Sequence, residues 1–250
     1  MDNILTVNNL CAFHTGTSRS EENSKQKKRR QILFNVSFAV KSGEILGLVG
    51  ESGSGKTTLV KTLLGINKDF TGKVEHYSEK PQMIFQDPYS SLNPVRKVGW
   101  ILEEALKIKG NFSKDERKKK VAYILGKVGL DDNIAERFPY QLSGGQRQRV
   151  SIAAALITEP RLLIADEPVS ALDVTIQSQI LDLLNMLHQE MGLSIIFISH
   201  DLRVVYKMCE RILIMNKGII IEEGNRQDIF DNPKSAYTKK LLAAAGYYDK

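Results

Sequence analysis

Three features are absent from this chain of 250 residues, and each absence excludes a class of protein. The two cysteines, Cys11 and Cys209, are too few for a disulfide scaffold or for a four-cysteine metal site within this chain. No apolar run approaches the roughly 18–20 residues that a membrane-spanning helix needs. The first residues also lack the basic region and the long apolar stretch of a secretion signal. We therefore expect a protein of the reducing cytoplasm.

The composition is that of an ordinary globular protein, with 42% hydrophobic and 26% charged residues. Its net charge of +6 raises the question of an anionic partner, either nucleic acid or a membrane surface. Residues 21–30 and residues 113–120 each carry +3, so these two segments account for the whole excess. Neither segment interleaves aromatic side chains with its charges, which argues against a base-stacking surface for nucleic acid. Solvated surface charge is the favoured interpretation, and proximity to an anionic membrane is the alternative.

Short apolar runs alternate with helical patterns along the chain, which indicates a parallel sheet flanked by helices. Strands are expected at residues 4–13, 32–40, 45–49, 83–85, 162–165, 194–199 and 212–215. Helices are expected at residues 56–64, 98–109, 114–128, near 135, and at 144–157, 174–191 and 202–208. Residues 15–31 are polar and predict a loop, while residues 87–146 predict a helical subdomain inserted into the α/β core.

A glycine-rich loop at residues 50–57 fits the pattern G-x-x-x-x-G-K-[ST] between an expected strand and an expected helix. Glycines let the backbone wrap around phosphates, and the N–H groups at the helix N-terminus then face the negative charge. Lys56 would reach the β- and γ-phosphates, and the Thr57 hydroxyl would bind Mg²⁺. The residues predicted to hold the nucleotide here are Gly50, Glu51, Ser52, Gly53, Ser54, Gly55, Lys56, Thr57 and Thr58. By itself, the loop fits a kinase, a GTPase or a helicase equally well.

Two further motifs could complete an ATP site. The apolar run 162–165 ends in Asp166 and Glu167, which predicts a strand that places Asp166 near Mg²⁺ and Glu167 beside the attacking water. The second motif, Leu142-Ser143-Gly144-Gly145-Gln146, opens an expected helix. Ser143 would be the N-cap of that helix, and the exposed N–H groups would bind an anion. A second phosphate-binding helix start is useful if it serves a nucleotide bound by another chain.

In this order, the motifs resemble those of the ATP-binding subunit of an ABC transporter, and the resemblance extends over about residues 4–245. It implies an α/β fold with a P-loop (RecA-like) core, an antiparallel β subdomain and an inserted α-helical subdomain. It also divides the chain into four parts. These are residues 1–86 (β subdomain and phosphate loop), 87–146 (helical subdomain), 147–222 (second part of the core) and 223–250 (helical tail).

The resemblance further implies how the motifs act together. Two subunits sandwich two ATP molecules head to tail. In this arrangement Lys56, Thr57 and Asp166 of one subunit face Ser143, Gly144, Gly145 and Gln146 of the other. Glu167 is then the general base, His200 contacts the γ-phosphate, Gln86 contacts Mg²⁺ or the attacking water, and Asp173 lines the junction between subunits. An aromatic residue of the first strand normally stacks on adenine, and here Phe13 is the candidate, with His14 as the alternative.

Finer features resemble the oligopeptide, dipeptide and nickel importers among these transporters. The stretches that carry this likeness are residues 85–94, 144–149, 166–174 and 231–242. Ser235 and Ala236 depart from the group, because they stand where it usually has His-Pro. The cysteine-rich iron–sulfur segment of some members is not in this sequence.

The resemblance implies the shorter of two different ATPase subunits, which forms a heterodimer and could form a homodimer in isolation. It implies two membrane permease subunits, an extracytoplasmic substrate-binding protein, and a peripheral position on the cytoplasmic face of the cell membrane, with no nucleic acid. Peptides, dipeptides, nickel and metal chelates all stay open as cargo. Three alternative functions are also considered: a nucleic-acid-associated ABC ATPase, a small-molecule kinase and the ATPase of an exporter.

Overall fold

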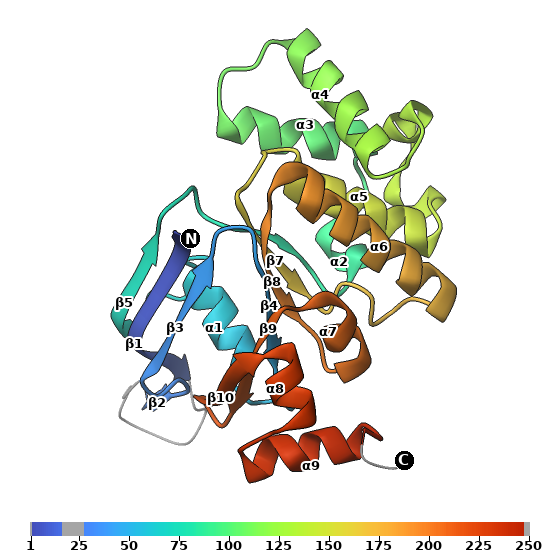
Figure 1. Ribbon diagram of the computed structural model, residues 1–250. Helices are drawn as coiled ribbons and strands as arrows, with labels where there is room; N and C mark the ends of the chain where they lie inside the picture. The colour runs from blue at the N-terminus through green and yellow to red at the C-terminus, as the bar shows by residue number, and fades with distance from the viewer. Residues whose placement is uncertain (1, 17–27, 248–250) are drawn as a thin grey trace, which may run out of the picture. The chain divides into compact units, whose positions relative to one another are not determined.

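The computed structural model describes residues 2–16 and 28–247. The chain divides into two compact units, the first made of Met1–Ser78 with His200–Lys250 and the second of Glu79–Ser199. Both units combine strands with helices (Figure 1), as the expected α/β class requires. The finer division into four parts at residues 86, 146 and 222 stays a prediction.

β1 (Asn3–Gly16) is the central strand of an antiparallel sheet in the first unit. It pairs with β3 (Val36–Lys41), β5 (Phe70–His76) and β2 (Lys28–Gln31), and β5, β1 and β3 lie side by side in Figure 1. Its side chains alternate between the core and the other face, so that Leu5 and Val7 are fully buried. This sheet is the antiparallel β subdomain that the resemblance implies.

The prediction of a loop over residues 15–31 is wrong at both ends of that segment. β1 continues to Gly16, and β2 pairs with it so that Thr15 lies opposite Arg29. The polar composition predicted a loop, but a strand ladder is built from backbone hydrogen bonds that polar residues make equally well. Residues 17–27, which include most of the first basic segment, lie outside the described residues.

The expected strand at residues 32–40 begins only at Val36. Asn35 adopts a left-handed backbone conformation, with φ of 54°, which interrupts an extended strand. Just before it, the Phe34 N–H donates to the carbonyl oxygen of Gly218 at 2.9 Å. Residues 32–35 therefore serve as a connection between two parts of the first unit rather than as sheet.

A second sheet segment of the first unit consists of β4 (Ile45–Val49), β9 (Arg211–Asn216) and β10 (Ile219–Asn225). β4 and β9 are parallel, and β10 returns antiparallel to β9. All five residues of β4 are buried, as is typical of a parallel strand covered on both faces. α1 (Lys56–Leu63) follows β4, and α7 (Leu202–Met208) packs against β4.

Cys209 is a packing residue at the end of α7. A Cβ atom on Gly47 of β4 would lie 3.0 Å from the Cys209 Sγ, so the glycine allows helix and strand to approach closely. Burial raises the pKa of the Cys209 thiol far above its ordinary value. Burial thus disfavours the thiolate, which agrees with a packing role for this side chain.

The C-terminal helices α8 (Arg226–Asp231) and α9 (Ala236–Ala244) are joined by a turn that one carboxylate holds. Glu222 of β10 accepts hydrogen bonds from the N–H groups of Lys234 (2.7 Å) and Ser235 (3.0 Å) and from Thr238 Oγ1 (2.5 Å). Burial by itself raises the pKa of Glu222, but these hydrogen bonds outweigh it and lower the pKa below the ordinary value. The ionised carboxylate of Glu222 thus holds the start of α9 against β10.

The second unit contains a parallel sheet of β6 (Gln82–Ile84), β7 (Leu162–Asp166) and β8 (Ser194–Ile198), with β7 in the middle. Its helices are α2 (Pro88–Ser91), α3 (Val98–Lys109), α4 (Lys114–Lys127), α5 (Gly144–Leu156) and α6 (Val174–Met191). α5 packs on β6 and contacts the other four helices. This helix is the centre of the helical subdomain.

The segment near Ala135 forms a 3₁₀ helix, η1 (Asp132–Glu136), where an α-helix was expected. The N–H groups of Ile134 and Arg137 each donate to the residue three positions earlier, which is the 3₁₀ pattern. A second 3₁₀ turn, η2 (Pro139–Gln141), follows before α5. Such tight turns are short, so the sequence indicates a helix here without fixing its type.

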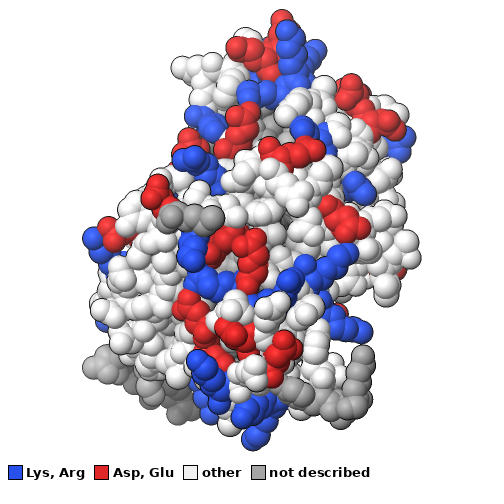
Figure 2. Space-filling view, viewed as in Figure 1, with Lys and Arg blue, Asp and Glu red and all other residues white. Residues whose placement is uncertain are grey.

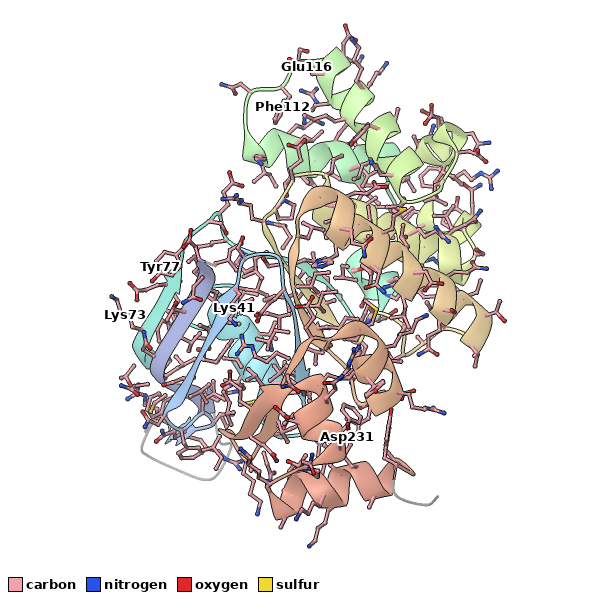
Figure 3. All side chains as sticks on the ribbon, in the orientation of Figure 1. Lys41, Lys73, Tyr77, Phe112, Glu116 and Asp231 are labelled. Atoms are coloured by element: carbon pink, nitrogen blue, oxygen red, sulfur yellow. The ribbon has the colours of Figure 1, made fainter. Side chains whose placement is uncertain are left out.

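The basic segment 113–120 is the start of α4, and several of its charges have partners within the second unit. Ser113 and Glu116 form a capping box at the helix start, where Figure 3 shows Glu116 beside the loop of Phe112. Arg117 pairs with Glu103 at 3.2 Å, and Lys120 pairs with Glu159 at 2.6 Å. Charges of both signs lie close together on the face drawn in Figure 2. These ion pairs favour the interpretation of ordinary surface charge.

Among the described residues, no helix combines the length and the apolar character that crossing a membrane requires.

The Glu222 cluster predicts an acid-sensitive tail. Because the pKa of Glu222 is lowered from 4.5 on folding, its carboxylate stabilises the fold above that pH, and the stabilisation is lost as the pH falls through the lower, folded-state pKa. Glu222→Gln should reduce the free energy of unfolding by about 1–2 kcal/mol at pH 7 and by less at pH 3. Urea unfolding at both pH values measures this, with the exposed Asp231→Asn as the control. An equal loss at the two pH values would contradict the role of the charge.

Candidate nucleotide-binding site

The phosphate loop connects β4 to α1 in the first unit, as expected. A Cβ atom on Gly50 would lie 2.1 Å from the carbonyl oxygen of Met215, so only glycine fits there. Gly55, the residue before α1, has φ of 108°, which is a conformation that favours glycine. The N–H of Gly218 donates to the Ser54 carbonyl oxygen at 2.8 Å. The turn between β9 and β10 therefore holds the loop in shape from outside.

Lys56 folds back over this loop. Its Nζ donates to the carbonyl oxygens of Gly50 at 2.6 Å and Glu51 at 3.0 Å. The ammonium group thus lies within the ring of loop atoms, where the loop's own carbonyl groups hold it. Thr57 is exposed at the first turn of α1, whereas Thr58 is buried. The Thr57 hydroxyl is accordingly the one that an ion near the loop could reach.

The two candidates for stacking on adenine have different surroundings. The His14 ring is hydrogen-bonded through Nε2 to Thr58 Oγ1 at 3.0 Å, which ties the end of β1 to α1. The Phe13 ring is half-buried, and the Arg29 guanidinium lies 3.6 Å from its centroid. Which of the two residues stacks on adenine stays a prediction.

Gln86 and Glu167 lie together in the second unit. Gln86 follows β6 and Glu167 follows β7, and these strands are parallel neighbours, so both residues come from the same edge of the sheet. Gln86 Nε2 donates to Glu167 Oε2 at 3.0 Å. Glu167 has φ of 46°, a left-handed conformation that costs a non-glycine residue on the order of 1 kcal/mol or more. Its N–H donates to the Ile198 carbonyl oxygen at 2.9 Å, which helps to hold that conformation.

Ser143 is the N-cap of α5, as predicted. Its Oγ accepts from the Gln146 N–H at 3.2 Å, while Gln146 Oε1 accepts from the Ser143 N–H at 3.1 Å. This capping box fixes the start of the helix, with Gly144 and Gly145 in its first turn. A Cβ atom on Gly145 would lie 3.0 Å from Ile176 of α6, so the glycine also serves close helix packing.

The remaining predicted residues lie at the ends of strands or helices. Asp166 is the last residue of β7, and Asp173 is the N-cap of α6, accepting from the Ile176 N–H at 3.0 Å. His200 is exposed and follows β8 by two residues. Within the first unit the structure brings the phosphate loop, His14 and α1 together, and within the second it brings Gln86 and Glu167 together. The catalytic and binding roles of these residues stay predictions.

Comparison with known proteins identifies the family. Residues 33–170, more than half of the chain, match the family model described as "ABC transporter". The chain belongs to the ABC transporter family. The predictions of this family, of its ATPase subunit and of its fold are confirmed.

Curated relatives of this ABC transporter ATPase include two peptide-transport proteins. The dipeptide transport ATP-binding protein DppF of Escherichia coli (strain K12) is 44% identical over 229 residues, covering 86% of this chain and 69% of the relative. The oligopeptide transport ATP-binding protein OppF of Haemophilus influenzae is 42% identical, covering 96% of this chain and 80% of the relative.

Solved structures agree with the fold. The cbiO1 protein of Clostridium perfringens, part of the ABC transporter complex cbiONQ, has a TM-score of 0.76 at 28% identity and covers 97% of this chain and 96% of its own. The ATP-binding cassette MJ0796, as a dimer in a post-hydrolysis state with ADP and Pi, has a TM-score of 0.72 at 27% identity. It covers 89% of this chain and 98% of its own.

Two residues near the motifs of this ABC transporter ATPase escaped the sequence analysis. Arg147 follows the Leu142–Gln146 motif and is buried. Its guanidinium lies 3.4 Å from the centroid of the Tyr89 ring and donates to the carbonyl oxygens of Pro139 and Leu142. It thereby joins the segment after Gln86 to the start of α5. The position of Arg147 directly after the motif could have pointed to this residue in the sequence.

The second missed residue is Tyr237 of α9. Its hydroxyl oxygen accepts a hydrogen bond from the Glu51 N–H at 3.3 Å, so the C-terminal tail touches the phosphate loop. Burial raises the pKa of Tyr237, which keeps the hydroxyl protonated at neutral pH. No local pattern links residues 51 and 237, because they are brought together only by the fold.

Removal of this hydroxyl should loosen the loop. In Tyr237→Phe, the Glu51 N–H loses its partner, and amide hydrogen exchange within residues 50–55 should quicken about fivefold, as the loss of one hydrogen bond predicts. Exchange measured by mass spectrometry on the full chain tests this, with the exposed Tyr140→Phe as the matched control. Unchanged exchange in Tyr237→Phe would show that the contact does not restrain the loop.

Proposed function

We propose that this ABC transporter ATPase powers the import of peptides across the cytoplasmic membrane. The observation that carries the proposal is the combination of a preformed phosphate loop with the hydrogen-bonded Gln86–Glu167 pair. The peptide cargo rests on the relatives, because proteins for dipeptide and oligopeptide transport are 44% and 42% identical to this chain.

Lys56 and the loop backbone would bind the triphosphate. In the structure the Lys56 ammonium is held by two carbonyl oxygens, and these are weaker partners for a cation than phosphate oxygens are. On ATP binding, Lys56 would exchange the carbonyl groups for the β- and γ-phosphates. The N–H groups of residues 53–58 at the N-terminus of α1 would bind the remaining phosphate oxygens.

The donor set fits a magnesium ion. Thr57 offers an exposed hydroxyl, Asp166 a carboxylate and Gln86 an amide oxygen that its hydrogen bond to Glu167 does not use. These are the hard oxygen ligands that Mg²⁺ prefers, and such an ion needs only one or two of them when phosphates and water supply the rest. Bound there, Mg²⁺ would neutralise charge on the phosphates of ATP.

Glu167 would act as the general base. Its carboxylate is held by Gln86 Nε2 and by the strained backbone at the end of β7, so it has a defined direction. It would accept a proton from the attacking water, while His200 would contact the γ-phosphate. Phe13 would stack on adenine.

Two such ATPase subunits would act as a head-to-tail dimer. The start of α5, with Ser143, Gly144, Gly145 and Gln146, would bind the γ-phosphate of an ATP held by the partner, and Asp173 would lie at the junction. ATP binding would close the dimer and hydrolysis would open it. The dimeric arrangement of the MJ0796 cassette with ADP and Pi supports this part of the proposal.

The partners would be a second, different ATPase subunit, two membrane permease subunits and an extracytoplasmic substrate-binding protein. A homodimer could form in isolation. The chain would then sit at the cytoplasmic face of the cell membrane, bound to the permeases. No role in nucleic-acid binding is proposed, because the basic segments carry no interleaved aromatic side chains and two cations of α4, Arg117 and Lys120, pair with acids.

Loss of the Lys56 ammonium should abolish turnover. Lys56→Ala removes the charge that stabilises the transferred phosphoryl group, so ATP hydrolysis should fall at least about 100-fold. Release of phosphate by the assembled transporter measures this, with Lys61→Ala as the control, because Lys61 is exposed on the same helix. Undiminished hydrolysis in Lys56→Ala would remove the phosphate-loop assignment.

Glu167→Gln should separate binding from hydrolysis. The amide cannot accept the proton of water, so hydrolysis should fall about 100-fold or more, while ATP still closes the dimer. Size-exclusion chromatography with ATP should show a stable dimer, and a reconstituted transporter should stop importing a labelled dipeptide. The exposed Glu104→Gln serves as the control. Fast steady-state hydrolysis by Glu167→Gln would rule out the general-base role.

A further inference from the structure

Arg29, near the end of the basic segment 21–30, contacts Phe13, the proposed base-stacking side chain. Arg29 lies on β2, opposite Thr15 of β1, and its guanidinium is 3.6 Å from the centroid of the Phe13 ring. At this distance a planar guanidinium lies directly against the ring, as in a cation–π pair. One face of Phe13 is therefore already covered.

Asp69 holds Arg29 in this position. Its carboxylate accepts from Arg29 Nε at 3.0 Å and from Arg29 Nη2 at 2.6 Å, which is the two-pronged geometry that arginine favours. The Phe13 N–H in turn donates to the Asp69 carbonyl oxygen at 2.9 Å. Phe13, Arg29 and Asp69 thus form a small cluster from β1, β2 and the turn before β5.

The covered face lies at the protein surface. Phe13 is half-buried and the Arg29 side chain that covers its ring is 50% exposed. A purine stacked on that face would need the volume that the guanidinium fills. Both groups recognise the aromatic face by stacking, and one ring face accepts only one of them.

We infer that Arg29 competes with the nucleotide base for Phe13 and thereby lowers the affinity of this chain for ATP. The inference rests on the proposed function, in which Phe13 stacks on adenine. Binding of the base replaces the Arg29–Phe13 contact by a base–Phe13 contact, and Arg29 moves into solvent. The ion pair with Asp69 opposes this movement, but it is partly exposed, so water can replace the contact of the guanidinium with the carboxylate.

The competition concerns the base and leaves the phosphates untouched. Phosphate binding belongs to the loop at residues 50–57, which has its own supports in Met215, Gly218 and Tyr237. Inorganic tripolyphosphate carries the phosphates without a base, so its affinity reports the loop alone. A comparison of ATP with tripolyphosphate therefore isolates the effect at Phe13.

The test is the affinity of Arg29→Ala for each probe, measured by titration calorimetry on the full chain with Mg²⁺ present. Arg29→Ala should lower the Kd for ATP about two- to fivefold, the value of one exposed cation–π contact, and should leave the Kd for tripolyphosphate unchanged. Arg30→Ala is the matched control, because it removes the same charge from an exposed neighbour on β2. Arg30→Ala should change neither the Kd for ATP nor the Kd for tripolyphosphate.

A double-mutant cycle assigns the effect to the ring. In a Phe13→Ala background, Arg29→Ala should no longer raise the affinity for ATP. If Arg29→Ala weakens ATP binding, or leaves it equal to that of the Arg30→Ala control, the inference is overturned. Failure of the proposed function looks different, since the unchanged protein would then bind neither ATP nor tripolyphosphate.

Discussion

The shape of the phosphate loop is the constraint on which this ATPase depends, and distant parts of the first unit impose it. Met215 leaves room only for a glycine at position 50, the Gly218 N–H holds the Ser54 carbonyl group, and Tyr237 accepts from the Glu51 N–H. The backbone of the loop is thereby fixed by contacts within the first unit. Such preorganisation lowers the cost of ordering the loop at the moment of binding.

In the second unit, neighbouring elements position the proposed catalytic carboxylate of Glu167 in a similar way. Adjacent parallel strands place Gln86 and Glu167 at one edge, and a hydrogen bond joins their side chains. The left-handed backbone at Glu167 is tolerated because the Ile198 carbonyl group accepts its N–H. Nearby, Arg147 packs against Tyr89 and holds the carbonyl groups of Pro139 and Leu142. The segments after Gln86 and before α5 are therefore connected by one buried side chain.

Part of the positive charge of the chain has acidic partners in the structure. Two cations of α4 pair with acids of the second unit, Arg117 with Glu103 and Lys120 with Glu159. Arg29, at the end of the other basic segment, lies between Phe13 and Asp69.

The sequence alone was sufficient where the determining interactions are local. Periodicity predicted the bounds of β4, α3, α6 and α7, and the phosphate loop and the carboxylates after β7 were recognised from residue types at fixed spacing. It failed for β2, β5 and β10, which pair with neighbouring strands through their backbones. Only the tertiary structure decided that Phe13 is covered by Arg29, that Gln86 holds Glu167 and that Tyr237 supports the loop. Each of these contacts joins residues far apart in the chain, and their meeting depends on strand pairing and packing rather than on any local preference.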